Sequence, residues 1–340
     1  GDWTTDRIDA AGSLLSQADG AAWSQELCGM IGWPTETLPP IVGCTERTGH
    51  VTAEAAACTG LSQGTLVICG TSDTAAETYG AGMTSPGRGV IKLATAATVS
   101  VLSPQPHPDR TVINYPHVMP EMFYTIAATN SCASAHRWLR DTFFLRPGDD
   151  GGAVYAEMDR AAAQIMPGAE GLFFHPYLNG ERSPHWDPLL RAEFAGIGFN
   201  HGPGHFVRAL YEGVSYSLRD CLEALRTLGL DFQTARLIGG GAKSAVWQQI
   251  AADVLDVEIE VPNSGDASFG AALIAGVGAG VFGSEIQAAS AIGVRTRVAP
   301  DPDRSARYAQ GYEIYRALHA ALAPLHHRIH AFAADTEGAV

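Results

Sequence analysis

The sequence predicts a layered α/β protein built from two lobes. Its 340 residues, of which 46% are hydrophobic, suffice for two substantial cores. Short apolar runs typical of buried strands alternate with stretches of helical periodicity, and this alternation favours sheets covered by helices. Because the pattern changes at a Pro-Gly turn just after residue 85, we expect the lobes to span residues 1–83 and 84–340.

The first lobe ends with a strand, a turn and a helix. Residues 66–83 are LVICGTSDTAAETYGAGM, in which the apolar run at about 65–69 predicts a buried strand. The Ala-rich stretch that starts at Thr74 predicts a helix ending at Gly80 or Gly82. The next segment, MTSPGRGVIKLATAATVSVLS at 83–103, predicts a turn followed by a β-hairpin.

The second lobe shows clear alternation of helices and strands. Apolar residues at three- and four-residue steps predict a long amphipathic helix that closes at Gly229; they are Val207, Leu210, Val214, Leu218, Cys221, Leu222 and Leu225. A strand is expected at 235–238, a helix at 244–255, a strand in VEIEVP and a helix in ASFGAALIAGVGAGVF. One face of the last helix carries Tyr308, Tyr312, Tyr315, Leu318, Leu322 and Leu325.

Charge and composition narrow the ligand class. The net charge of -14 argues against nucleic-acid and membrane partners, since phosphates would be repelled, and favours a small molecule. Because basic residues are scarce, an anionic ligand would be held by backbone amides, helix N-termini or a bound cation. The scattered cysteines, without metal-finger spacing, suggest reduced thiols and a cytoplasmic protein, and no export signal or membrane span is visible.

Asp73 stands where the strand passes to the helix, and two interpretations are open. Its carboxylate could cap the helix by accepting hydrogen bonds from the first free amides. Alternatively, it could be a general base, because α/β proteins tend to bind ligands at the carboxyl ends of their strands.

The three glycines at 239–241 also leave two interpretations open. A Walker phosphate loop is excluded because Ala242 precedes Lys243, and the dinucleotide fingerprint fails because Ser244 occupies the place of its last glycine. What remains is either a tight turn or a backbone that approaches a nucleotide closely.

Histidines and charged residues elsewhere are given structural interpretations. The loop HPYLNGERSPHWDPLLRAEFAGI at 175–197 is expected to cross the surface, with Glu181 paired to Arg182 or Arg191. No helical spacing supports a metal site at His175, His185 and Asp187, and the sequence has no nucleophile elbow for a Ser-His-Asp hydrolase. His326, His327 and His330 are expected near a helix end, where imidazoles meet the dipole favourably.

Taken in order, these segments resemble the FGGY carbohydrate kinases, and within them the xylulokinase branch. The resemblance is carried by five segments in order. They are TTDRIDAAGSLL, the stretch 49–82 with its Gly-x-x-Asp motif at Asp73, YLNGERSPHWDP, FAGIGFNHGPGHFVRALYEGVSYSLRD at 194–220, and GGGAKSAVWQQIAADVLDVEIEVP followed by GDASFGAALIAG. It implies a two-lobed actin-like ATPase fold of the ribonuclease H-like kind.

The resemblance also implies a function and a set of site residues. ATP with Mg²⁺ would phosphorylate a ketopentose, D-xylulose, with Asp73 as the catalytic base and Thr74 beside the substrate. Thr95 and Thr98 would offer hydroxyls to the phosphates, and Gly240, Gly241 and Ser244 would hold adenosine; no protein metal ligand is assigned. Gluconate is the alternative sugar, because TNSCASAHRWLRD at 129–141 resembles a gluconate-kinase segment, and a homodimer is common in related kinases.

Two departures from the family pattern keep a third possibility open. Ala96 and Ala97 stand where the family usually has a glycine-containing phosphate turn, and alanine adopts positive φ angles only at a cost. The sequence also lacks the leading strand and Asp-x-Gly-Thr turn of the family, so we expect an incomplete first lobe. A non-catalytic nucleotide-binding remnant is therefore the alternative of another class.

Overall fold

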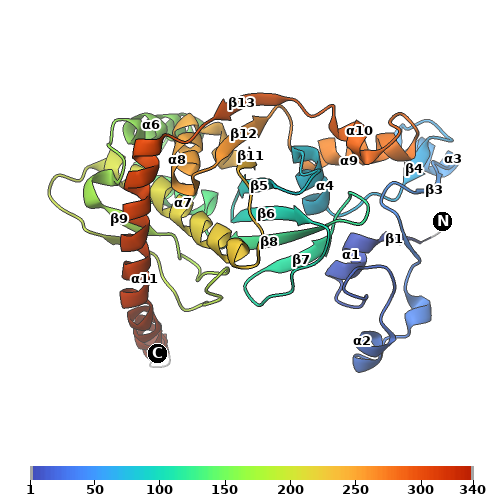
Figure 1. The fold of residues 1–340 in the computed structure, drawn as a ribbon, viewed down its shortest axis with the longest axis horizontal. Coiled ribbons are helices and arrows are strands. Elements are labelled where there is room, and N and C mark those ends of the chain that lie inside the picture. The colour runs from blue at the N-terminus through green and yellow to red at the C-terminus, as the bar shows by residue number, and fades with distance from the viewer. Residues whose placement is uncertain (1–2, 338–340) are drawn as a thin grey trace.

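A mixed seven-stranded sheet organises the molecule. The computed structural model describes residues 3–337, and Figure 1 shows their arrangement. Within these residues the sheet has the order β13 (Val294–Val298), β12 (Glu258–Pro262), β11 (Thr234–Ile238), β5 (Arg88–Leu93), β6 (Ala97–Ser103), β8 (Phe123–Thr129) and β7 (Ile113–Pro116). The central strands β5, β11 and β12 are parallel, whereas the remaining neighbours pair antiparallel.

Helices cover both faces of this sheet. One face is covered by α7 (Pro203–Thr227) and α8 (Ala245–Leu255), behind which lie α5 (Ala133–Leu139), α6 (Gly151–Ala163) and α11 (Pro302–Glu337). The other face is covered by α4 (Asp73–Ala81), which packs on α9 (Ala267–Gly278) and near α10 (Glu285–Ala289). These positions agree with the helices and strands that the sequence predicts.

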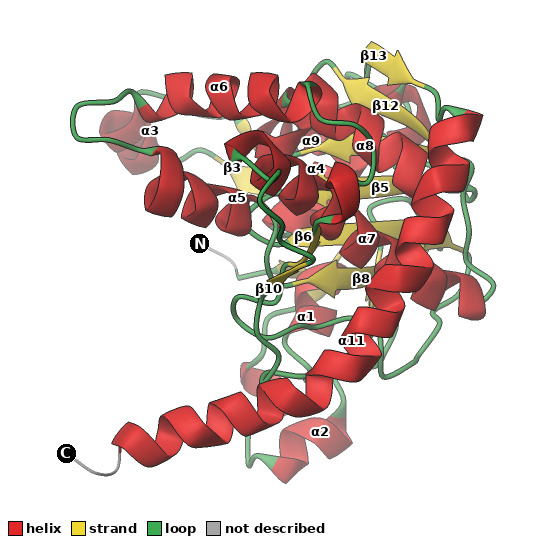
Figure 2. Cartoon of the chain, turned by 90° about the vertical axis from the view of Figure 1, so that its left-hand side faces the viewer, coloured by secondary structure: helices red, strands yellow, loops and turns green. Residues whose placement is uncertain are grey.

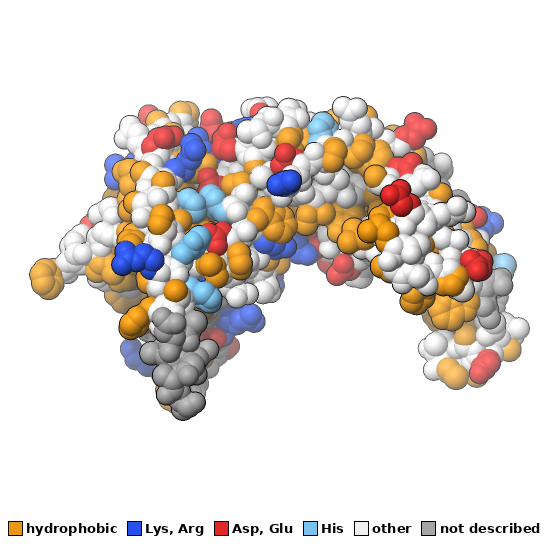
Figure 3. Space-filling model, turned by 90° about the horizontal axis from the view of Figure 1, so that it is seen from below, with side chains coloured by type: hydrophobic (Ala, Val, Ile, Leu, Met, Phe, Trp, Pro, Cys, Tyr) orange, Lys and Arg blue, Asp and Glu red, His pale blue; other side chains and the backbone are white. Residues whose placement is uncertain are grey.

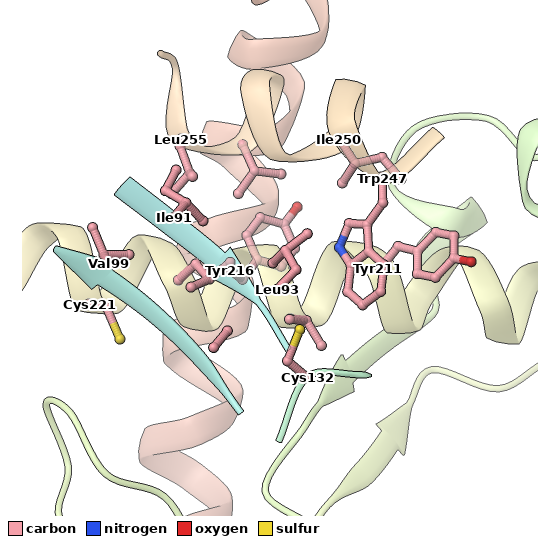
Figure 4. Packing of buried hydrophobic residues seen from close by; sticks show 14 of the residues in the cluster. Ile91, Leu93, Val99, Cys132, Tyr211, Tyr216, Cys221, Trp247, Ile250 and Leu255 are labelled. Carbon is pink, nitrogen blue, oxygen red and sulfur yellow. The ribbon is translucent and has the colours of Figure 1, made fainter. Parts of the chain in front are cut away.

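Successive side chains of β5 point to opposite faces of the sheet, and both faces are apolar. Ile91 and Leu93 point into the core formed with α7 and α8, whereas Val90 contributes to the core on the α4 side. In Figure 4 the side chain of Ile91 lies next to Leu255 of α8, and Val99 of β6 belongs to the same core. The strand is therefore buried on both sides.

The segments before residue 83 lie at one end of the molecule (Figure 1). They comprise β1 (Thr5–Asp6), α1 (Arg7–Gly12), α2 (Gln25–Met30), β2 (Ile41–Val42), β3 (Arg47–His50), α3 (Ala53–Thr59) and β4 (Leu66–Ile68). A further pair, β9 (Phe173–His175) and β10 (Glu193–Ala195), lies beside α7. Seen from below, the surface is hollowed between the N-terminal segments and the α11 side (Figure 3). The lobe boundary near residues 83–85 stays a prediction.

The last helix departs from two expectations. Of the apolar residues expected on one face, Tyr308, Tyr312 and Tyr315 are buried but Leu325 is exposed, because the second half of α11 projects beyond the body of the molecule (Figure 2). The histidines of α11 do not sit at its end, since the helix runs on to Glu337. His326 pairs with Glu193 and His327 with Asp187 instead, so the expected dipole interaction is wrong.

No helix in the part of the chain from 3 to 337 is both long and apolar enough to cross a bilayer.

Two glycines allow α4 and α9 to touch. A Cβ added at Gly80 would lie 2.8 Å from the amide nitrogen of Gly270, and a Cβ added at Gly270 would lie 1.8 Å from the carbonyl oxygen of Ala76. Any side chain at Gly270 must therefore push the helices apart, which would move the start of α4.

We predict that Gly270→Ala destabilises the protein by about 3 kcal/mol, because overpacking a helix contact forces the backbone to shift. Urea unfolding measures the change. The control is Gly29→Ala in α2, where an added Cβ meets no atom within 4 Å and alanine should be neutral or stabilising by up to ~1 kcal/mol. Equal midpoints for the two variants would contradict the role given to the glycine contact.

Candidate functional site

Asp73 opens the helix α4 but does not cap it. The strand β4 ends at Ile68, and Gly70 takes a left-handed conformation with φ 75° in the turn that follows. The cap is Ser72, whose hydroxyl accepts from the amide of Ala75 at 3.4 Å. The carboxylate of Asp73 is exposed, and among residues 3–337 its hydrogen bonds come only from Thr74, whose amide donates at 2.6 Å and hydroxyl at 3.2 Å. The capping interpretation is therefore wrong, and the carboxylate is left accessible.

A pocket of about 510 Å³ lies beside this turn. Its polar wall includes Ser72, Thr74 and Thr98, and its sheet wall is made by side chains of β7 and β8; the other lining residues are Ile8, Asp9, Gly12, Ile113, Tyr115, Tyr124, Ile126, Ala128 and Arg182. The pocket thus combines hydrogen-bonding groups with an apolar floor, as small-molecule sites commonly do.

Two further carboxylates belong to this pocket region. Asp6 is buried, caps α1 and accepts from the Thr71 hydroxyl at 2.8 Å, so it ties the first helix to the turn before Asp73. Burial, with the charges of Asp6 and Asp73, raises the pKa of Asp9. Neither Asp6 nor Asp9 was predicted as a site residue from the sequence, although both lie in the TTDRIDAAGSLL segment.

The β5–β6 turn is built without left-handed residues. No residue from Ala94 to Ala97 has a positive φ, and the turn closes with the Ala94 amide donating to the Ala96 carbonyl at 3.1 Å. The Thr95 carbonyl accepts from the Cys132 amide at 3.0 Å and the Ser134 hydroxyl at 2.7 Å. The alanines therefore fit a turn that is braced by the start of α5, and they do not require the glycine geometry.

A second pocket, of about 500 Å³, contains the glycine segment. Its walls come from α5, α6, the 3-10 turn at Gly240–Lys243 and the start of α8; its lining is Ala133, His136, Gly152, Tyr155, Ala156, Asp159, Gly240, Gly241, Lys243, Ser244 and Trp247. The structure thus brings Gly240, Gly241 and Ser244 together in this pocket, and Thr74 and Thr98 together in the first. Thr95 lines neither of these two pockets and is exposed.

Different structural constraints act at the three glycines 239–241. Gly239 has φ 91°, and a Cβ there would lie 2.5 Å from the Leu93 carbonyl oxygen. At Gly241 an added Cβ would lie 2.8 Å from the Leu93 Cβ. At Gly240 it would meet no atom within 4 Å. Gly239 and Gly241 are therefore required by the fold, whereas only the pocket has a reason to exclude a side chain at Gly240.

Polar side chains from four helices form one network in the wall of the second pocket. The Tyr211 hydroxyl on α7 bonds to Asp159 of α6, and His136 Nε2 of α5 lies 3.1 Å from the same hydroxyl. Ser244, which caps α8, donates to Asp159 at 2.9 Å. Tyr211 stacks on Trp247 with ring centroids 4.4 Å apart, and Figure 4 shows the two rings side by side. Sequence reasoning identified Ser244 alone, because its partners are far away along the chain.

Glu181 is a buried anchor and not a surface ion pair. Its carboxylate accepts from the Thr129 hydroxyl, the Ser217 hydroxyl and the amides of Asn130 and Arg182, at 2.6 to 3.2 Å. Burial raises the pKa of Glu181, although these donors oppose the rise. The expected pairing with Arg182 or Arg191 is therefore wrong. Glu181 fixes the loop that carries Arg182 into the first pocket.

The described residues offer few ligands for a metal ion. Between residues 3 and 337, no group of three or more His, Cys, Asp or Glu is arranged to hold one. A Mg²⁺ that arrives on nucleotide phosphates needs only one or two protein carboxylates. Asp9 and Asp73 are exposed carboxylates beside the first pocket, and the charge of Asp73 contributes to the raised pKa of Asp9.

Comparison with known proteins gives matches over most of the chain. Residues 1–80 match the N-terminal domain of the FGGY family of carbohydrate kinases, and residues 89–279 match its C-terminal domain. The chain is 31% identical over 338 residues to a protein named xylulose kinase from Lactococcus lactis, covering 96% of this chain and 66% of that protein. It is 30% identical over 312 residues to a gluconokinase from Bacillus licheniformis, covering 88% of this chain and 60% of that protein.

Solved structures agree with these matches. The xylulose kinase from Rhodospirillum rubrum superposes with a TM-score of 0.84 at 30% identity, covering 96% of this chain and 66% of that one. The two-lobed actin-like ATPase fold predicted from the resemblance is thereby confirmed. The chain spans 60% to 66% of the length of these three relatives, slightly less than two thirds.

The network around His136 predicts a pH dependence of folding. Burial, with a smaller contribution from Arg140, lowers the pKa of His136 from 6.5 to about 4. Between these pH values the unfolded chain binds a proton that the folded chain refuses, so stability falls as the pH falls. The His136→Gln variant keeps an N–H for Tyr211 but cannot bind this proton. We expect it to reduce the pH dependence of the free energy of unfolding by up to ~1.4 kcal/mol per pH unit.

Urea unfolding of both proteins between pH 8 and pH 4 measures this effect. Above pH 7 the difference between variant and wild type should be constant, because the imidazole is neutral in both states. Parallel stability curves down to pH 4 would rule out a buried neutral imidazole.

Proposed function

The chain belongs to the FGGY family of carbohydrate kinases, and on that premise we propose that it acts in the ATP-dependent phosphorylation of a ketopentose, D-xylulose giving D-xylulose 5-phosphate. The observation that carries the proposal is the exposed carboxylate of Asp73 beside a pocket with polar and apolar walls. The similarity to xylulose kinases over 338 residues supports the choice of sugar.

Asp73 acts as the general base in this proposal. As a sugar hydroxyl attacks the γ-phosphate of ATP, the carboxylate takes the proton from that hydroxyl. This role is supported by the geometry of the turn, since Ser72 caps α4 and leaves the second oxygen of Asp73 without a partner among residues 3–337. Thr74 and the carboxylate of Asp9 then serve as hydrogen-bond partners of the sugar hydroxyls, while CH groups of the sugar pack on Tyr115 and Tyr124.

The second pocket holds the nucleotide in this proposal. Gly240 and Gly241 let the backbone approach adenosine, and the phosphates extend toward the β5–β6 turn with Thr95 and Thr98. Bound Mg²⁺ supplies charge neutralisation on the phosphates. Lys243 is an exposed cation at the pocket lining, which offsets part of the net charge of -14.

Gluconate is the second candidate sugar, because gluconokinases are 29 to 30% identical to the chain. The proposal also includes a cytoplasmic protein that acts as a homodimer and has no nucleic-acid or membrane partner, which the negative charge favours.

We predict that Asp73→Asn lowers sugar-dependent ADP release by roughly 10²- to 10⁴-fold, the range for loss of a general base, with little change in ATP affinity. The assay uses the purified protein with Mg-ATP and D-xylulose, D-ribulose, L-ribulose, gluconate or glycerol. Glu54→Gln is the matched control, because it removes an exposed carboxylate from the first turn of α3. Turnover by the Asp73→Asn variant at the wild-type rate would exclude Asp73 as the general base. A wild-type enzyme that prefers gluconate would show that gluconate, and not D-xylulose, is the substrate.

We predict that Gly240→Val weakens nucleotide binding at least tenfold while folding stability changes little, because its side chain enters the open pocket. Calorimetric titration with Mg-ATP and a melting curve measure the two effects. Gly241→Val should instead lower the melting temperature, since its Cβ meets Leu93. Unchanged affinity in a folded Gly240 variant would show that the nucleotide binds elsewhere.

A further inference from the structure

The network in the second pocket leaves one carboxylate oxygen unused. Asp159 Oδ1 accepts from two hydroxyls, those of Tyr211 and Ser244. Ser244 cannot serve a ligand with the same proton, and its oxygen already accepts from the Trp247 amide at 3.1 Å. No donor in residues 3–337 reaches Oδ2 of Asp159, which belongs to the pocket lining.

The protons of the network can be assigned by counting donors. Tyr211 has one hydroxyl proton and gives it to Asp159, so His136 Nε2 must donate to the Tyr211 oxygen. Burial keeps His136 neutral, which is consistent with a single proton on Nε2. A chain of donors thus runs from His136 through Tyr211 to Asp159 and orients the carboxylate.

The position of Asp159 determines which part of a nucleotide faces it. A carboxylate repels phosphates, so the anionic end of the ligand lies away from Asp159 and the uncharged nucleoside end lies against it. Tyr155, one turn earlier on α6, also lines the pocket, with the Arg140 guanidinium 4.6 Å from its ring centroid. Aromatic and acceptor groups therefore meet at one end of the pocket.

We propose that Asp159 is the specificity-determining residue for the nucleoside, and that its free oxygen accepts a hydrogen bond from the exocyclic amino group of adenine or from a ribose hydroxyl. This inference rests on the proposed nucleotide site. Ser244 then acts as a positioning residue that holds Asp159. A base with a carbonyl oxygen in place of the amino group would face the carboxylate with two acceptors and be rejected.

The test is calorimetric titration of the full chain with the Mg²⁺ complexes of ATP, ITP, 2′-deoxy-ATP and 3′-deoxy-ATP. The wild type should bind ATP roughly 10- to 100-fold more tightly than the analogue that lacks the recognised donor, the range for a hydrogen bond to a charged group. Loss with ITP identifies the amino group, and loss with a deoxy analogue identifies the ribose. Equal affinities for all four nucleotides overturn the proposal without any variant.

The variant Asp159→Asn tests directly whether the free oxygen of Asp159 accepts this hydrogen bond. Because Tyr211 and Ser244 both donate to Oδ1, the Asn side chain must direct its NH₂ group into the pocket. If the adenine amino group is recognised, ATP binding weakens and ITP binding strengthens. If a ribose hydroxyl is recognised, the penalty for the deoxy analogue shrinks, because a neutral amide–hydroxyl bond replaces a bond to a charged carboxylate. Glu157→Gln is the control, since it removes an exposed carboxylate from the same helix and should keep the wild-type ratios.

A failure of the role given to Asp159 can be distinguished from a failure of the proposed nucleotide site. A folded Asp159→Asn variant with wild-type ratios among the four nucleotides shows that Asp159 is structural, and it leaves nucleotide binding intact. A wild-type chain that binds none of the four nucleotides overturns both the inference and the nucleotide site on which it rests.

Discussion

Direct contact between α4 and α9 is the constraint on which the candidate site depends. Gly80 and Gly270 let the two backbones approach so closely that a methyl group at Gly270 would overlap the Ala76 carbonyl. The helix that presents Asp73 is thereby positioned by a segment almost 200 residues later in the chain. Lys92 of β5 adds an ion pair to Glu77 of α4, so the same helix is also tied to the central sheet. The geometry of the turn at Asp73 is thus a tertiary property.

Features set by local sequence could be predicted, whereas those set by long-range contacts could not. The strands and helices of the second half follow from local periodicity, and the long helix α7 and the strand-turn-helix around Gly239 were predicted close to their observed bounds. Caps depend on competition between neighbouring residues, which is why Ser72 took the role expected for Asp73. Glu181 was interpreted wrongly because its partners Thr129 and Ser217 come from a strand and a helix that local patterns cannot bring together. Asp159 escaped notice for the same reason.

The glycine segment combines structural glycines with one that leaves space in the second pocket. Two of its glycines satisfy the backbone and the packing against Leu93, and one leaves space open. In the proposed nucleotide site, backbone groups and the exposed Lys243 would face the ligand, in keeping with the few basic residues of the chain.

The brace between the β5–β6 turn and α5 has a consequence for both pockets. Thr98 of the hairpin borders the first pocket, and Ala133, whose amide donates to the Ala94 carbonyl at 2.8 Å, borders the second. The two pockets have no lining residue in common, but these hydrogen bonds join the hairpin that borders one to the helix that borders the other. A substitution that shifts the turn between Leu93 and Ala97 would therefore disturb the geometry of both pockets.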